Sequence, residues 1–204
     1  MRAVIEECRR LFGPAPRSFG FWNYLTYIKA RRPPWMHARP GDFLNEPFFR
    51  RGMSLYNEQV PLVSSAEFHD KVKKDPNTEV IRKALVEANK NLKILSDAGI
   101  TIAMGTDSGV ANNPGRWQGY FEQVEMEMMN KAGMSPMQVI VASTGNAAKI
   151  MELKDVGTLE KGKWADLVVL RGNPLQNILN TRTIDTVWIG GAKLADLPPV
   201  TSTK

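Results

Sequence analysis

The chain has 204 residues, a net charge of +6, 43% hydrophobic residues and 24% charged residues, which is the composition of an ordinary globular protein with room for one sizeable core or two small domains. A single cysteine excludes an internal disulfide framework, and no apolar run approaches the ~18 residues of a membrane span. The first residues mix acids and bases among the apolar positions, unlike a signal peptide. We therefore expect a cytoplasmic location for the chain as it stands, with export open if the natural start lies upstream.

The net excess of positive charge lies in the N-terminal segment. Residues 1–40 hold eight Lys or Arg and two acids, whereas residues 41–204 hold 19 of each. A basic arm can bind phosphates, but a solvated flank is the commoner outcome, so this distribution does not favour a nucleic-acid partner.

The first sixty residues contain few regular patterns. Residues 19–28, FGFWNYLTYI, are aromatic and β-branched enough to predict a strand. The segment 30–41 is too rich in proline for a regular element. Residues 42–60 carry bulky apolar side chains without a clear period, which predicts an irregular or short-helical excursion.

The pattern becomes regular from residue 77 onward. Apolar residues every three or four positions predict a helix from about residue 78 to Asp97, closed by Gly99. The next five residues, 100–104, are predominantly apolar without alternation, which predicts a strand buried on both faces, as in a parallel sheet. Turn-forming residues then predict a loop over 106–116.

Further helices and a small β segment follow this loop. A helix is expected over about 117–132, and the Ser135-Pro136-x-Gln138 pattern is typical of a capping box that starts the next helix. Beyond residue 155, short strands and tight turns predict a β segment that includes a hairpin around Gly190-Gly191. Helix, strand, helix and helix in this order indicate a parallel α/β fold.

Asp107 is placed at the end of the predicted strand 100–104, three residues beyond Met104. Catalytic groups of α/β barrels lie on the loops at this end of the strands, where a carboxylate can bind a metal or accept a proton from a water molecule. The residues alone leave a second interpretation open, in which Asp107 caps its own turn in a loop rich in Ser and Gly.

Longer strings in the second half resemble a known family. These are GTDS (105–108), AGMSPMQVIVASTGNAAKIM (132–151), VGTLEKGKWADLVVLRGNPLQNI (156–178) and IGGAKL (189–194). Their order and spacing resemble the C-terminal part of the amidohydrolase superfamily, in particular its imidazolonepropionase-like and prolidase-like branch. The resemblance covers roughly residues 78–195.

This resemblance implies a fold class and a chemistry. The fold would be α/β, with the C-terminal part of a (β/α)8 TIM-type barrel (about strands 7–8 and the following helices) and a small β-sandwich segment. The activity would be metal-dependent hydrolysis of a C–N bond in an amide, cyclic amide or dipeptide-like small molecule, not peptide-chain endoproteolysis. One or two divalent ions, with zinc favoured, would be the cofactor, and Asp107 would be both a metal ligand and the catalytic base.

The loop that leaves Asp107 supplies the expected substrate contacts, Asn112, Arg116 and Trp117. Glu122, Glu125 and Glu127 on the next helix are expected to form a solvated face, with Glu122 or Glu125 open as a pocket-lining residue.

The sequence also departs from the family pattern. The family's His-x-His pair and its later histidine ligands are absent, and the two histidines present, His37 and His69, end no predicted strand. Because a catalytic zinc site needs about three protein ligands, we expect a fragment that is inactive alone. The alternative is a non-catalytic remnant or assembly module that pairs with a missing N-terminal half or with further copies of itself.

Four segments are expected along the chain. They are a basic, Pro-rich arm (1–41), a partial metal-hydrolase barrel (42–154), a β segment of a composite sandwich (155–196) and a mobile tail (197–204).

Overall fold

The structure is a computed structural model, and it describes residues 65–106, 108 and 118–194. The predicted arm 1–41, the strand 19–28, the excursion 42–60 and the tail 197–204 lie outside the described residues. The chain divides into two compact units. The described part of the first comprises residues 89–105 and 125–194, and that of the second comprises residues 65–88, 106, 108 and 118–124.

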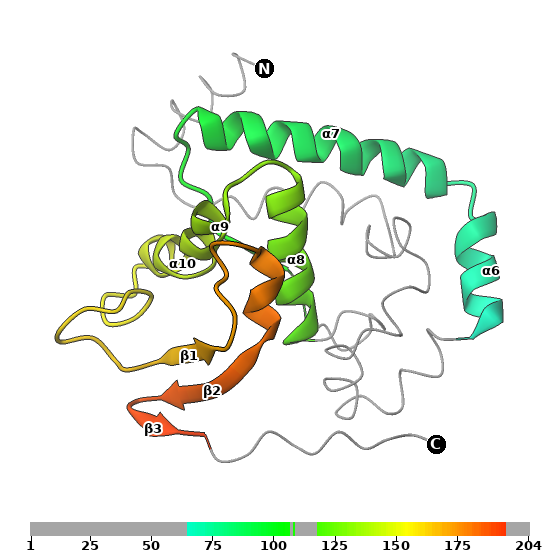
Figure 1. Cartoon of the computed structure of the whole chain (residues 1–204). Helices are drawn as coiled ribbons and strands as arrows, with labels where there is room; N and C mark the ends of the chain where they lie inside the picture. The colour runs from blue at the N-terminus through cyan, green and yellow to red at the C-terminus, as the bar shows by residue number, and fades with distance from the viewer. Residues whose placement is uncertain (1–64, 107, 109–117, 195–204) are drawn as a thin grey trace. The chain divides into compact units, whose positions relative to one another are not determined.

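The described elements follow one another in the order shown in Figure 1. They are α6 (Ala66–Lys74), α7 (Thr78–Asp97), α8 (Tyr120–Lys131), α9 (Pro136–Ser143), α10 (Gly145–Ile150), β1 (Leu167–Leu170), the 3-10 helix η2 (Ile178–Arg182), β2 (Ile184–Ile189) and β3 (Ala192–Lys193). Among the described residues, no helix is both long and apolar enough to cross a lipid bilayer.

The helix boundaries agree with the sequence signals. Helix α7 spans Thr78–Asp97 and buries Ile81 and Leu92 on one stripe. The capping box of α9 is present, because the Gln138 N–H donates to the Ser135 hydroxyl at 3.2 Å and the Ser135 N–H donates to Gln138 Oε1 at 2.7 Å. Local side-chain chemistry therefore determines where α9 begins.

The predicted strand 100–104 is not a strand among the described residues. Ile100 and Ile102 are buried, but the backbone here bonds to helices instead of to a sheet. The Met104 N–H donates to the carbonyl of Ala142 in α9 at 2.9 Å, and the Asn146 side chain in α10 donates to the Ile102 carbonyl at 2.9 Å. A buried apolar run becomes a strand only where neighbouring strands supply a ladder, and the described residues supply none here.

The β segment is an antiparallel three-stranded sheet in the order β1-β2-β3, and its strands lie side by side in Figure 1. Leu167 faces Trp188 and Val168 faces Val187, with an irregularity between Val169 and Leu170. The β2–β3 hairpin turns at Gly190 and Gly191, both with positive φ, as a two-residue primed turn requires. The predicted hairpin is confirmed.

One glycine permits a close approach between a loop and α10. Gly157 has φ +87, and a Cβ there would lie 2.4 Å from the Ala148 Cβ and 3.1 Å from the Thr144 carbonyl oxygen. Gly162 has a similar φ of +93, but no atom lies within 4 Å of its added Cβ. An alanine at either position would be strained by the positive φ, but only at Gly157 would its Cβ also overlap neighbouring atoms.

We therefore expect Gly157→Ala to lower the free energy of unfolding by about 3 kcal/mol, because overpacking adds to left-handed strain. Gly162→Ala should cost only about 1 kcal/mol. Urea unfolding of both variants measures the difference, and equal losses would contradict the expected overlap at Gly157.

Candidate active site

The four predicted site residues, Asp107, Asn112, Arg116 and Trp117, lie outside the described residues. Their described neighbours Thr106, Ser108 and Gly119 bracket them along the chain. The structure therefore describes the contacts of these three residues and not those of the predicted site residues.

All three neighbours bond to one carboxylate, that of Glu122 in α8. The Thr106 hydroxyl donates to Glu122 Oε1 at 3.1 Å, and the Ser108 hydroxyl donates to the same oxygen. The Gly119 N–H donates to Oε2 at 2.6 Å. The Ser108 N–H donates to the Thr106 hydroxyl at 3.3 Å, so residues 106 and 108 also bond to each other.

The start of α8 is determined by the same glutamate and by two aromatic rings. Glu122 is the third residue of α8 and accepts from the N–H just before the helix, which is half of a capping box. Tyr120 and Phe121 are 3% and 5% exposed, and their rings meet edge to face at 5.7 Å and 81°. Glu122 therefore projects from a helix end that is anchored by packing.

The expectation of a solvated face for Glu122, Glu125 and Glu127 was wrong. Glu122 is half-buried among its donors, and Glu127 is 7% exposed. Glu125 is also partly buried, and this burial raises its pKa from 4.5 to about 7. No local pattern distinguishes these three acids from exposed ones, apart from the position of Glu122 three residues after a glycine.

The raised pKa of Glu125 makes stability depend on pH. The folded state retains a proton that the unfolded chain releases above pH 4.5, so unfolding becomes easier as pH rises. We expect the free energy of unfolding to be highest below pH 4.5, to fall by up to about 3 kcal/mol as the pH approaches 7, and then to level off.

Denaturant unfolding of the wild type and of Glu125→Gln across pH 4.5–8 tests this expectation. The glutamine variant should lack that fall, because its amide does not titrate. A fall of equal size in both proteins would show that other groups cause it.

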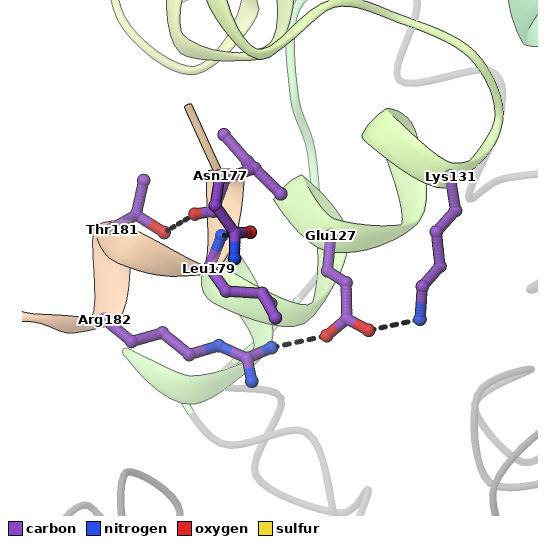
Figure 2. A network of polar contacts seen from close by, with 7 residues as sticks. Glu127, Lys131, Asn177, Leu179, Thr181 and Arg182 are labelled. Carbon is purple, nitrogen blue, oxygen red and sulfur yellow. Dashed lines mark hydrogen bonds and ion pairs between the residues drawn. The ribbon is translucent and has the colours of Figure 1, made fainter. Parts of the chain in front are cut away.

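Glu127 forms the second polar cluster, drawn in Figure 2. Its Oε2 accepts from Arg182 Nη2 of η2 at 2.7 Å, and its Oε1 accepts from Lys131 one turn along α8. The side chains of Arg182 and Glu127 are only 13% and 8% exposed. This ion pair joins α8 to the β segment, 55 positions away in the sequence.

The described residues do not fit a metal ion by themselves. Among residues 65–106, 108 and 118–194, no three His, Cys, Asp or Glu side chains gather closely enough to hold one. The carboxylates of Glu122 and Glu127 instead accept hydrogen bonds from protein donors.

Comparison with known proteins gives the family. The model of the amidohydrolase family matches residues 64–194. The chain is 30% identical over 104 residues to an imidazolonepropionase of Deinococcus deserti, a match that covers 49% of this chain and 25% of that protein. It is 34% identical over 99 residues to an ochratoxinase of Aspergillus niger, which covers 46% of this chain and 19% of that one.

A solved structure gives a likeness of fold. A putative prolidase from Bifidobacterium longum superimposes with a TM-score of 0.51 at 24% identity, over 75% of this chain and 35% of that one. The matches span only a quarter or less of the two curated relatives. Because the family model matches well over half of the residues, the chain belongs to the amidohydrolase family, whose fold is a TIM-barrel-type domain and whose members generally use divalent metals.

Proposed function

We propose that the protein that contains this chain hydrolyses a C–N bond in an amide, cyclic amide or dipeptide-like small molecule. The observation that carries this proposal is the match of the amidohydrolase family model over residues 64–194. The names of the relatives, an imidazolonepropionase, an ochratoxinase and a putative prolidase, support a small-molecule substrate of this chemical class.

Asp107 is the residue that we assign to proton transfer. The oxygen of a water molecule attacks the carbonyl carbon, and the C–N bond breaks. The Asp107 carboxylate accepts a proton from that water and passes it to the departing nitrogen, so that an acid and an amine leave. Asn112, Arg116 and Trp117, on the same loop, are proposed to contact the substrate.

Asp107 is also proposed as a metal ligand. A divalent ion, for which zinc is favoured, would polarise the carbonyl group and make the water more acidic. A zinc site usually takes three protein ligands, and the chain has only two histidines, His37 and His69. We therefore propose that the remaining ligands come from a further part of the protein or from a partner chain, and that this chain alone is inactive.

The same segments expected from the sequence remain our proposal for the domains. Residues 42–154 would belong to the barrel, and residues 155–196 would belong to a composite β-sandwich, with 1–41 and 197–204 as flanks. The small sheet formed by β1, β2 and β3 supports a separate β segment at this place.

The test uses the protein purified from the cells that make it, with any partner that it carries. Elemental analysis should find one or two divalent ions per molecule, and a panel of N-acyl amino acids, cyclic amides and dipeptides should include a substrate. A purified protein that holds no divalent metal and hydrolyses no member of the panel would refute the proposal.

An assembly module is the second candidate, favoured by the scarcity of histidine ligands in the sequence. In that case the chain would bind a partner without turning over a substrate. Size-exclusion chromatography with light scattering separates the two candidates when combined with the assay, because a stable complex without hydrolysis supports only the module.

A further inference from the structure

We propose that one apolar face of the β1–β2–β3 sheet binds the same face of a second copy of this chain. The inference deepens the second candidate function, the assembly module, and it rests on that candidate because it names the surface and the partner. All the residues that carry it are described and belong to the first compact unit.

The pairing of the strands determines which side chains share this face. Val168 of β1 lies opposite Val187 of β2, and further along β2 Ile189 lies opposite Ala192. The Leu194 N–H donates to the Val187 carbonyl at 2.8 Å, which continues the β2–β3 ladder by one pair. Opposite residues lie on the same face, and every second residue of a strand returns to it. This face, which we call the open face, therefore consists of Val168, Val187, Ile189, Ala192 and Leu194.

Trp164 extends the open face at the hairpin end of the sheet. It stands four positions before Val168, so alternation along the segment that leads into β1 places both on the same side. The Cζ3 atom of its ring lies 3.4 Å from the position that a Cβ on Gly190 would take, at the turn of the β2–β3 hairpin (Figure 1). The Ala165 carbonyl accepts from the Gly191 N–H at 3.1 Å, so this segment is held against the hairpin.

The two faces of the sheet differ in polarity. On the other face, Lys193 lies opposite Trp188, whose Nε1 donates to Thr186 Oγ1 at 3.1 Å. An antiparallel sheet that is exposed on one side usually carries polar side chains on that side. The open face is instead 50–62% exposed at four large apolar residues, which are Trp164, Val168, Ile189 and Leu194.

The exposed apolar area is sufficient for a weak dimer. At these exposures the open face presents about 350 Å² of apolar surface per copy. Because roughly 60% of an interface is apolar, two copies that cover this surface would bury about 1,200 Å² in total. Such a total is at the lower end of specific interfaces. A second copy therefore fits the open face by area.

The charges at the two ends of β1 also fit a second copy. Asp166 precedes β1 and Arg171 follows it, and both are exposed. Arg171 bonds to Asp185 at 3.1 Å, and the Asp166 carboxylate accepts from the Gly190 N–H at 2.6 Å. When a two-fold axis reverses the strand direction between the copies, Asp166 of each copy lies towards Arg171 of the other. Opposite charges then meet at the rim around an apolar centre, as in specific interfaces.

Four variants test the open face and the orientation. Val168→Lys and Leu194→Lys each place a charge on the face, and the second lies at the edge strand, where lysine is well tolerated. Val169→Lys is the matched control, because Val169 is the next residue of β1, is also exposed and lies on the other face, opposite Thr186. Arg171→Glu opposes an acid to Asp166 of the second copy. Circular dichroism and urea unfolding establish that each variant folds.

Sedimentation velocity of the purified full chain, measured as a function of concentration, needs neither substrate nor metal. We expect a monomer–dimer equilibrium with a Kd of about 1–100 µM, because interfaces of this size are weak. Val168→Lys and Leu194→Lys should raise Kd by about 10-fold or more, since a charge buried without a partner is unfavourable. Val169→Lys should change Kd by about 2-fold or less. Arg171→Glu should raise Kd by about 3- to 10-fold at low salt.

A chain that remains monomeric well above that concentration range would overturn the inference, and so would a dimer that all three lysine variants weaken equally. A complex with a different polypeptide, disrupted by Val168→Lys and not by Val169→Lys, would assign the open face to that partner instead of to a second copy. An unchanged Kd in Arg171→Glu would overturn the antiparallel arrangement.

Hydrolysis is assayed separately, so that the proposed function is judged independently. A monomer that hydrolyses a substrate would overturn the dimer and leave the proposed hydrolase standing. A dimer without turnover would support the inference and the assembly module, and would count against the hydrolase.

Discussion

Replacing Asp107 by asparagine is expected to lower kcat of the purified protein by about 1,000-fold, the size of effect that a lost general base usually has. The amide has nearly the shape of the carboxylate, but it cannot accept a proton from water at neutral pH. Because the proposed role is in the chemical step, kcat should fall much more than KM changes.

Asp97→Asn is the matched control for this prediction. Asp97 ends α7 and forms an exposed ion pair with Lys93 at 2.5 Å. The same chemical change at this surface site should leave kcat unchanged, since an exposed i,i+4 pair on a helix contributes only about 0.3–0.5 kcal/mol. Steady-state kinetics with one substrate measure kcat of both variants. An equal kcat in Asp107→Asn and Asp97→Asn would show that Asp107 does not transfer the proton.

Replacing Arg182 by methionine is expected to lower the free energy of unfolding by about 3–5 kcal/mol. The variant leaves the buried Glu127 carboxylate without its guanidinium partner (Figure 2). Lys131 still bonds to Glu127, but the Lys131 side chain is 57% exposed and does not replace the buried charge. The loss comes from a buried charge left poorly paired, more than from the bond itself.

Two further variants test that explanation. Glu127→Met/Arg182→Met removes both charges and should recover most of the stability, because apolar side chains of similar volume can replace a buried pair at little cost. Arg171→Met breaks the exposed pair with Asp185, at 3.1 Å, and should cost less than about 1 kcal/mol. Denaturant unfolding measures all three, and a double variant as unstable as Arg182→Met would contradict the account.

Features with a local cause could be predicted from the sequence. The capping box of Ser135 and Gln138 uses residues three positions apart, and the Gly190-Gly191 hairpin needs only a turn that accepts positive φ. The length of α7 follows from its apolar period and from Gly99 after its end. Each of these signals acts within one or two turns of chain.

Features that depend on distant partners were missed or predicted wrongly. The apolar run 100–104 has the composition of a buried strand, yet a strand also needs neighbours, and here its backbone bonds to α9 and α10. Glu122 and Glu127 look alike in the sequence, but one bonds to a loop 14 and 16 positions back and the other to an arginine 55 positions ahead.

The sequence by itself determined the family resemblance, the helix boundaries, the hairpin and the choice of Asp107 as a candidate residue. These features depend on short-range chemistry and on the order of residues along the chain. Only the tertiary structure decided which glutamates are buried and what they bind. Burial of a carboxylate depends on donors brought from elsewhere in the chain, whose positions depend on how the whole chain packs. The Gly-Thr-Asp-Ser stretch therefore predicts a role for Asp107, whereas only the structure shows that the hydroxyls of Thr106 and Ser108 donate to Glu122.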